Sequence, residues 1–315
     1  MSPIGASSVA KNAPWLIGAI VGIMEMEENS MKWEEMDVEE KVNKACSLMK
    51  SVSHASNPFI AFSGGKDSVV LEFLAKEAKL KLPLMHNVTT IDPEGTLSFC
   101  KRHGATLLRS GMSFLDLVEK KGFPTMFRRF CCQFLKEQYI GNCGFFGIRK
   151  NESVKRSQCY DDVSDIYYYS KKQYTERFFP ILYFTDDDIR YLVEKHSIEN
   201  HPIYYDHQGK FCVERRLGCI GCPLQGDRGK SDYLQYPLLL KQVLRRGILF
   251  HQRMGRTADD AALNLVYNLF YSNGKYELFE QTYKGLFDTD PWEILDSYFF
   301  LEKDEVMRRL PKPKF

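Results

Sequence analysis

The chain has 315 residues, enough for one large domain or two ordinary ones, and its 44% hydrophobic and 27% charged content is typical of a soluble globular protein. The net charge of +2, from 43 basic and 41 acidic residues, neither demands nor excludes a nucleic-acid partner. Nine cysteines, an odd number with clustered spacing, argue against a secreted disulfide framework and favour metal or thiol chemistry.

The first apolar segment, WLIGAIVGIM at 15–24, is too short to span a bilayer. It is also a poor signal peptide, because the acidic EMEENS follows it and no small-residue cleavage site is present. A start at Met24 or Met31 is an alternative explanation of this segment. We therefore expect a cytoplasmic protein without membrane association, whose residues 1–35 form a poorly defined N-terminal segment.

Short apolar runs then alternate with segments of helical periodicity. A helix is expected over 37–53 with Asp37 as its N-cap, and another over 95–104 that ends at Gly104. The remaining helices are predicted from the glycine turn after residue 62 to about Leu80 and over 112–121, and strands are predicted over 58–62, 81–90, 105–110 and 145–149. This alternation predicts an α/β fold, a parallel twisted sheet with helices on both faces.

The pattern changes after Arg177. The apolar FFPILYF leads into a predicted helix over 185–197, which has Thr185 as N-cap and an acidic first turn. Helical periodicity from Ser231 onward predicts a helical C-terminal region. There, Lys241, Arg245 and Arg246 put positive charge on a helix that could follow the phosphates of a nucleic acid, although such a run is more often a solvated face.

The sequence FSGGKDSVV, residues 62–70, lies between a predicted strand and a predicted helix. A glycine turn in that position points several backbone N–H groups at one spot, the helix dipole adds to the attraction, and Lys66 supplies a full positive charge. It is not a Walker A loop, because Ile60 stands where the first glycine is needed and Asp67 follows the lysine. A tight turn with surface charges is the plain alternative. The complete SGGKDS sequence favours an anion-binding loop.

SGGKDS resembles the signature of the PP-loop, or adenine nucleotide α-hydrolase-like, family. The resemblance implies that residues 36–228 form a PP-loop nucleotide-binding domain that includes the cysteines, followed by a helical region over 229–315. It further implies that the loop binds the phosphates of an adenine nucleotide. The implied loop residues of this site are Ser63, Gly64, Gly65, Lys66, Asp67 and Ser68.

Further segments resemble the phosphoadenosine phosphosulfate (PAPS) reductase branch of that family, and together they cover roughly residues 40–225. NVTTIDPEGTLSF implies nucleotide contacts, although Thr89-Thr90 stands where the family usually has Asp-Thr. GIRKNESVKRS implies phosphate or sulfate clamps, because guanidinium forks suit tetrahedral oxyanions; arginines on a solvated surface are the alternative. The residues concerned are Asp92, Glu94 and Thr96 for the nucleotide contacts and Arg149 and Arg156 for the clamps.

The cysteines form two close pairs, Cys131-Cys132 and Cys219-x-x-Cys222, which together offer four soft ligands to a metal centre. Adenylyl-sulfate (APS) reductases, which these motifs resemble, hold a [4Fe-4S] cluster through such a pattern. The related ATP-pyrophosphatase of DNA phosphorothioation uses a cysteine shortly before its CxxC, so Cys212 competes as a ligand. Structural zinc and unligated buried cysteines are the alternatives.

The reductases attack sulfur with a cysteine near their C-terminus, whereas this sequence has no cysteine after Cys222. We therefore expect an enzyme that uses ATP with Mg²⁺, releases pyrophosphate and adenylates an acceptor for sulfur transfer, with Lys66, Asp67, Arg149 and Arg156 as its catalytic residues. DNA or tRNA is the expected acceptor, and a cysteine desulfurase is one sulfur donor of the required kind. The alternatives are a PAPS or APS reductase that uses an external thiol such as thioredoxin, and a catalytically silent nucleotide-binding subunit.

Overall fold

The computed structural model describes residues 32–125, 128–160, 162–225, 232–233 and 235–256. Within these ranges the chain forms two compact units, and each is assembled from separate stretches of sequence. The first unit takes its described residues from the stretches up to 86, 95–108 and 139–217, and the second from 87–94, 109–138 and the stretch from 218 on. These boundaries differ from a linear division at 36 and 229, because the chain passes between the units several times. None of the described helices is long and apolar enough to cross a membrane.

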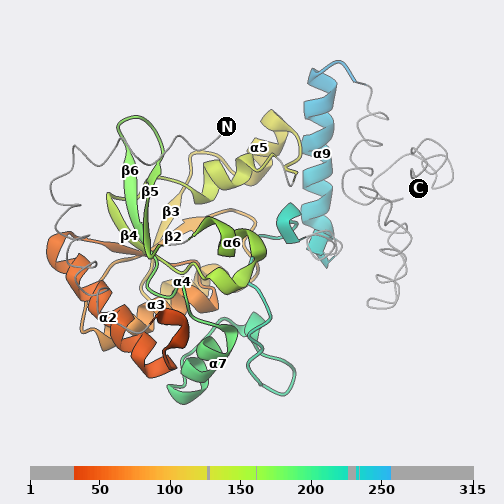
Figure 1. The fold of residues 1–315 in the computed structure, drawn as a ribbon. Coiled ribbons are helices and arrows are strands. Elements are labelled where there is room, and N and C mark those ends of the chain that lie inside the picture. Colours follow the sequence, from red (N-terminus) through yellow and green to blue (C-terminus); the bar gives the residue numbers. More distant parts are fainter. Residues whose placement is uncertain (1–31, 126–127, 161, 226–231, 234, 257–315) are drawn as a thin grey trace, which may run out of the picture. The chain divides into compact units, whose positions relative to one another are not determined.

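The first unit is built on a six-stranded sheet with the order β3-β2-β1-β4-β6-β5 (Figure 1). β1 pairs in parallel with β2 and β4, β4 pairs in parallel with β6, and β5 runs antiparallel to its partner β6. This confirms the expected α/β fold with a mostly parallel sheet. The strands are β1 (Phe59–Ala61), β2 (Leu84–Val88), β3 (Thr106–Arg109), β4 (Cys143–Phe146), β5 (Ser164–Tyr168) and β6 (Tyr174–Phe178).

Close packing in the middle of the sheet fixes the place of β1. A Cβ atom on Gly144 of β4 would lie 2.6 Å from the ring of Phe59, so the lack of a side chain there lets the Phe59 ring lie against the neighbouring strand. Ile60 is fully buried between β2 and β4. The loop after β1 therefore begins at the end of a closely packed, buried strand.

Helices of the first unit pack around α3, which follows that loop. α3 contacts β1 and β4, and α2 and α7 pack against α3 (Figure 1). The predicted N-caps are confirmed: Asp37 and Thr185 each complete a capping box, with Glu40 and Asp188 respectively. The α-helices of this unit are α2 (Val38–Ala55), α3 (Lys66–Glu77), α4 (Thr96–Arg102), α6 (Val154–Cys159) and α7 (Asp186–Lys195), and its short helices are η1 (Trp33–Glu35), η3 (Lys150–Glu152) and η4 (Pro202–Tyr204).

The second unit contains two helices that pack along each other, α5 (Phe114–Lys121) and α9 (Pro237–Arg253) (Figure 1). A Cβ on Gly122 would lie 2.9 Å from the Phe250 ring, which explains a glycine at this contact. Glu119 of α5 pairs with Arg246 and Arg253 of α9. The unit also holds a π-helical turn, η2 (Cys132–Lys136), and a short helix, η5 (Pro223–Gln225).

The structure differs in part from the elements expected from the sequence. The strand predicted over 145–149 begins earlier, at Cys143, and ends at Phe146. The antiparallel hairpin of β5 and β6 was not predicted at all. The expected helical C-terminal region is seen as α9, and its continuation over 257–315 lies outside the described residues, as does nearly all of the N-terminal segment. The part of that segment that is described, η1, places Trp33 in stacking contact with Tyr183.

Candidate functional site

The predicted anion loop has the backbone geometry of a phosphate cradle. Gly64 has a φ of +76°, and a Cβ there would lie 3.1 Å from the Sγ of Cys100, so glycine suits both the conformation and the space. Gly65 is the N-cap of α3 and brings no capping side chain. The first N–H groups of α3 therefore have no side-chain cap and are available to an anion.

Two serines brace the loop from within. The Ser63 Oγ accepts a hydrogen bond from the Gly65 N–H at 3.2 Å, and the Ser68 hydroxyl donates to the Gly65 carbonyl at 2.8 Å. The two hydroxyl oxygens lie 3.2 Å apart. The structure thus brings together all six predicted loop residues on a short, internally hydrogen-bonded turn.

Lys66 is a buried cation with little counter-charge. Its side chain is 4% exposed, and its Nζ lies 3.6 Å from Asp67 Oδ2 and 5.6 Å from the centre of the Tyr204 ring. Burial lowers the pKa of the Lys66 ammonium, and the Asp67 carboxylate only partly offsets this effect. A desolvated ammonium of this kind is stabilised by any anion that reaches the loop.

Arg149 lies inside the protein and has carboxylates on two sides. Its side chain is 1% exposed; its Nε donates to Asp67 Oδ1 at 2.6 Å and its Nη2 to Asp186 Oδ1 at 2.8 Å. The third nitrogen, Nη1, donates to the Phe184 carbonyl at 3.3 Å. The guanidinium predicted to clamp phosphate therefore holds the carboxylate of the loop, which makes Arg149 a positioning residue in this structure.

The second predicted clamp is more open. Arg156 has a 39% exposed side chain and pairs with Glu152. Burial lowers the pKa of its guanidinium, and attraction to Asp67 opposes that change. Arg216 was not predicted as a site residue. Its positive charge lowers the pKa of the Lys66 ammonium, and its guanidinium donates a hydrogen bond to the Glu152 carbonyl at 2.6 Å. Its position two residues before Gly218 of the GCIGC segment was the available signal.

The residues predicted from the NVTTIDPEG segment have different surroundings. Asp92 accepts hydrogen bonds from the Thr89 N–H at 2.9 Å and the Thr89 hydroxyl at 2.7 Å, so its carboxylate closes a local turn in the second unit. Glu94, also in that unit, is exposed. Thr96 begins α4 in the first unit, and its buried Oγ1 has no hydrogen-bond partner within the described part of the chain. Of the three, Thr96 is the one with a buried polar atom that has no partner among the described residues.

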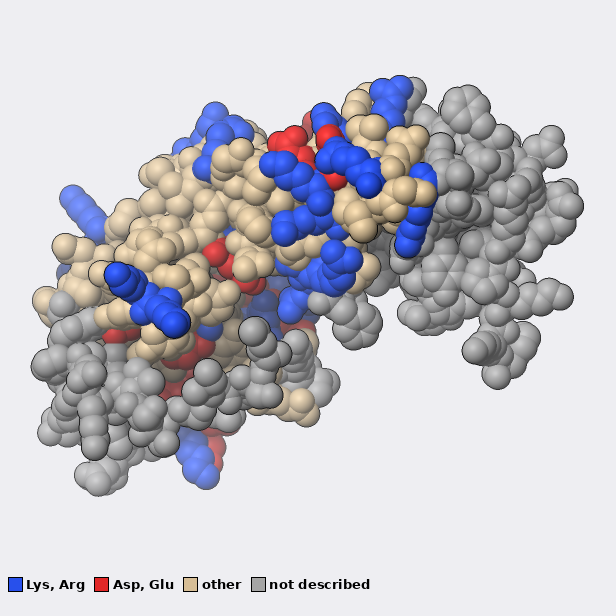
Figure 2. All heavy atoms as spheres, turned by 90° about the horizontal axis from the view of Figure 1, so that it is seen from above, with Lys and Arg blue, Asp and Glu red and all other residues tan. Residues whose placement is uncertain are grey.

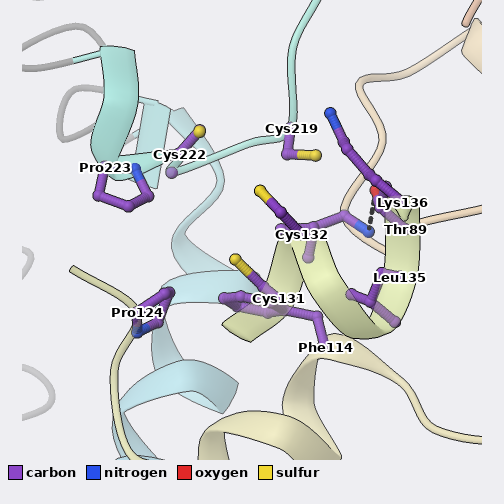
Figure 3. Close-up of a pocket in the computed structure, with 12 residues that line it drawn as sticks. Thr89, Phe114, Pro124, Cys131, Cys132, Leu135, Lys136, Cys219, Cys222 and Pro223 are labelled. Carbon is purple, nitrogen blue, oxygen red and sulfur yellow. Dashed lines mark hydrogen bonds between the residues drawn. The ribbon is translucent and has the colours of Figure 1, made fainter. Parts of the chain in front are cut away.

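The second unit contains a pocket lined by four thiols (Figure 3). Cys131 and Cys132 come from the start of η2, and Cys219 and Cys222 from the segment before η5. The Ile220 N–H donates to the Ile91 carbonyl at 2.9 Å, which fixes the CxxC segment within this unit. The two cysteine pairs that the sequence predicted as partners therefore meet in one pocket.

The pocket shifts the pKa values of its thiols in different directions: it lowers the pKa of Cys132, whereas burial raises that of Cys222. The Cys131 thiol acts as donor to Cys132, which lowers the pKa of Cys132 to about 6 and raises that of Cys131. Lys136, one helical turn after Cys132, has an exposed stem, but Figure 3 shows its amine directed toward Cys219. Burial alone would lower the pKa of Lys136, and the surrounding cysteines outweigh that effect and raise it. Sequence reasoning missed Lys136, although its helical spacing from Cys132 was a usable signal.

Four thiols of this kind are a suitable donor set for an iron–sulfur cluster. Cys212 is different: it lies in the first unit, and its Sγ faces the Lys210 carbonyl at 3.5 Å. In the described part of the chain, no three His, Cys, Asp or Glu side chains converge tightly enough to hold a single metal ion.

The positive helix predicted from the C-terminal region is α9. Figure 2 shows Lys and Arg side chains gathered over the α5–α9 pair, with acidic side chains among them. Arg246 is one of the two arginines paired with Glu119, whereas Arg245 is exposed; the side chain of Lys241 lies outside the described residues. Part of this charge is therefore used to join α9 to α5.

The described residues form an α/β fold with a mostly parallel sheet, in which a glycine loop and a buried lysine at the start of α3 form a candidate anion site. The chain belongs to the phosphoadenosine phosphosulfate reductase domain family of the PP-loop superfamily, whose sequence profile matches residues 57–225. The uncharacterized protein MJ0973 of Methanocaldococcus jannaschii is 25% identical in a 235-residue alignment that covers 70% of this chain and 53% of that protein. The chain thus spans about half the length of this curated relative.

Solved structures with a similar fold are distant. PAPS reductase from Candida auris, in a phosphate complex, has 12% identity and a TM-score of 0.38, covering 55% of this chain and 90% of that one. The U34-tRNA thiolase NcsA from Methanococcus maripaludis with its [4Fe-4S] cluster has 15% identity and a TM-score of 0.35, covering 87% and 88%. Likenesses at this level do not bear on the reaction.

Proposed function

We propose that this chain is an ATP-using PP-loop enzyme that adenylates an acceptor for sulfur transfer, of the nucleic-acid thiolation or phosphorothioation type. The observation that carries the proposal is the buried Lys66 ammonium beside the uncapped N-terminus of α3. Both features leave the loop short of negative charge, and the phosphates of a nucleotide supply it.

The chemistry uses the loop to stabilise a leaving group. An acceptor oxygen attacks the α-phosphorus of ATP, the bond from that phosphorus to the bridging oxygen breaks, and pyrophosphate leaves with the electron pair. Lys66 stabilises the charge that develops on the departing phosphates, and the more open Arg156 and Arg216 are placed to assist. Arg149 keeps Asp67 in position. A sulfur nucleophile at the oxidation level of sulfide then displaces AMP, which leaves with the acceptor oxygen.

Magnesium would be bound mainly by the nucleotide. Both oxygens of Asp67 face cations, with Arg149 Nε at 2.6 Å and Lys66 Nζ at 3.6 Å, so the loop alone is not a magnesium site. Mg²⁺ is commonly bound by substrate phosphates together with one carboxylate, and Asp67 is the carboxylate of the loop that would bind it.

The sulfur part of the proposal is supported by the thiol pocket of the second unit. Cys131, Cys132, Cys219 and Cys222 would hold a [4Fe-4S] cluster, which when bound supplies iron to which sulfur can attach. Zinc is the alternative metal for the same thiols, and it would stabilise the fold of the second unit. DNA or tRNA is the proposed acceptor, and a cysteine desulfurase is a suitable sulfur donor.

A second candidate function is sulfonucleotide reduction with an external thiol donor such as thioredoxin, and the reductase domain match favours it. Anaerobically purified full-length protein is incubated with Mg²⁺ and, separately, ATP, APS and PAPS, and pyrophosphate, AMP and sulfite are quantified. The proposal predicts pyrophosphate from ATP and no sulfite. Sulfite release with a thiol donor establishes the reductase, and nucleotide binding without turnover, with or without a desulfurase, establishes a silent subunit.

A further inference from the structure

The hairpin of β5 and β6 forms the edge of the sheet in the first unit and has no role in the site described above (Figure 1). Its strands pair in the register Tyr168 with Tyr174 and Tyr167 with Thr175. A turn over 169–173 joins them, in which the Tyr169 N–H donates to the Gln173 carbonyl at 3.0 Å. The hairpin is therefore a defined structure with an unusual concentration of tyrosine.

The tyrosine rings contact one another on both faces of the hairpin. Tyr168 and Tyr174 have ring centroids 5.9 Å apart, and on the other face Tyr167 and Tyr169 lie 4.9 Å apart. Tyr139 extends the second group, with its ring 5.7 Å from that of Tyr169. These contacts hold the rings in fixed orientations, which reduces the entropy lost when a flat ligand stacks on them.

Several of these rings are open to solvent. Tyr168 is 51% exposed and Tyr139 is 39% exposed, and the Tyr139 hydroxyl donates to Asn142 Oδ1 at 2.6 Å. A single exposed aromatic residue is ordinary, but here each of the two exposed rings belongs to a group of contacting tyrosines, one group on either face of the hairpin, and the two groups together form an interaction surface. The five residues of this tyrosine surface are Tyr139, Tyr167, Tyr168, Tyr169 and Tyr174.

The charge beside the tyrosine surface is positive. Lys171 and Lys172 are exposed in the turn, and neither has an ion-pair partner among the described residues. The acidic residues of the strands do not offset them: Asp165 pairs with Arg177, and Glu176 is buried. The Arg177 guanidinium also lies over the Tyr167 ring, 4.7 Å from its centroid. Exposed aromatic rings with unpaired lysines match the stacked bases and phosphates of a nucleic acid strand.

We propose that the β5–β6 hairpin is a docking surface for a single-stranded nucleic acid, whose bases stack on the exposed tyrosines while its phosphates contact Lys171 and Lys172. A duplex hides the faces of its bases, so the surface selects unpaired strands. The inference rests on the proposed function, and it specifies that the acceptor presents unpaired nucleotides to the enzyme.

The test is fluorescence anisotropy with the full-length protein, without ATP, and with labelled oligouridylate, oligothymidylate and a duplex, each about 15 nucleotides long. Tyr168→Ala should weaken single-strand binding about 5- to 150-fold. The double change Lys171→Ala/Lys172→Ala should reduce the slope of log affinity against log salt by about 1.4. Tyr191→Ala is the matched control, because Tyr191 is 41% exposed on α7 with the Lys195 amine 5.1 Å from its ring centroid, and it should bind like wild type.

The outcomes separate this inference from the proposed function. Equal affinity of wild type and the hairpin variants, a preference for the duplex, or binding of anionic vesicles in place of oligonucleotides would each overturn the docking surface. Lys66→Ala should bind oligonucleotide normally while losing pyrophosphate release. If wild type binds single strands through the hairpin but releases no pyrophosphate from ATP, the docking surface stands and the proposed reaction fails. Circular dichroism of each variant shows whether it is folded.

Discussion

Arg149 donates from Nε to Oδ1 of Asp67 at 2.6 Å, and the two residues are 82 positions apart in the sequence. The same guanidinium donates to Asp186 and to the Phe184 carbonyl, so its three nitrogens are all used. Through Asp67 and Asp186, Arg149 therefore connects the start of α3 to the start of α7. The geometry of the nucleotide loop therefore depends on a buried ionic network that no local sequence motif specifies.

Removal of the buried guanidinium should destabilise the protein strongly. Arg149→Met leaves Asp67 without its nearest partner, and loss of one member of a buried pair typically lowers the free energy of unfolding by about 3–5 kcal/mol. Urea unfolding monitored by circular dichroism measures the change. Arg190→Ala is the control, because the Arg190–Asp187 pair is exposed and its loss should change stability by less than about 1 kcal/mol. A similar small change in Arg149→Met would refute the structural role.

Lys66 should have opposite effects on stability and activity. Lys66→Ala removes a desolvated charge, so the melting temperature should be unchanged or higher, while pyrophosphate release from ATP should fall about 100- to 1000-fold. Lys76→Ala on the same helix is the control, because Lys76 is 68% exposed and pairs only with Glu72 among the described residues. Equal turnover by the two variants would show that Lys66 does not act on the nucleotide.

The lowered pKa of Lys66 also predicts a pH dependence. Because burial lowers the pKa in the folded protein, the unfolded chain keeps this proton to a higher pH, and the Lys66 contribution to stability rises with pH between the lowered pKa and the usual value of 10.5. Nucleotide binding needs the charged form and should weaken over the same range. Calorimetric titration of ATP at several alkaline pH values measures this effect, and Lys66→Ala should remove the pH dependence.

The thiol pocket predicts which cysteines bind the metal group. Cys131→Ser, Cys132→Ser, Cys219→Ser and Cys222→Ser should each lower the iron and acid-labile sulfide content of anaerobically purified protein. Cys212→Ser should retain both, because its thiol lies in the first unit and faces the Lys210 carbonyl. A cluster that survives the Cys131 and Cys132 changes but not the Cys212 change would reverse this assignment. Zinc without iron in wild type would identify the alternative metal.

Glu176 should make stability fall as pH rises. Burial raises the pKa of its carboxyl from 4.5 to about 7, and its Oε1 has no partner among the described residues. The folded protein therefore holds a proton that the unfolded chain loses, and stability should drop by up to about 3 kcal/mol between pH 4.5 and 7. Urea unfolding across this range should show a smaller drop in Glu176→Gln. The exposed Glu214→Gln is the control, and it should keep the wild-type profile.

Local features of the fold were predictable because their signals lie within a few residues. Asp37 and Thr185 cap their helices as expected, and Gly104 ends α4 with a φ of +79°. The β5–β6 hairpin was missed because SDIYYY and YTERF mix tyrosine with charges and lack a continuous apolar run. Strand pairing there depends on contacts across the sheet edge, which periodicity does not report.

The site was predictable in part for the same reason. The loop residues from Ser63 to Ser68 form one contiguous motif, in which the structure has a glycine turn after β1 and Lys66 as the first residue of α3. The burial of Arg149 depends on Asp67 and Asp186, which are distant in sequence. Cys212 belongs to the first unit and the other four thiols to the second because the chain passes between the two units, and spacing along the sequence cannot show this.

The proposed reaction breaks the bond between the α-phosphorus of ATP and the oxygen that bridges it to the β-phosphate. ATP labelled at the α-phosphate is incubated with Mg²⁺ and the anaerobically purified protein, with a sulfide source and unfractionated tRNA or single-stranded DNA, and the labelled products are separated by thin-layer chromatography. The account predicts labelled AMP, with an equal amount of pyrophosphate, that depends on Lys66 and rises with the acceptor. Labelled ADP, or AMP formed equally well by Lys66→Ala, would contradict it.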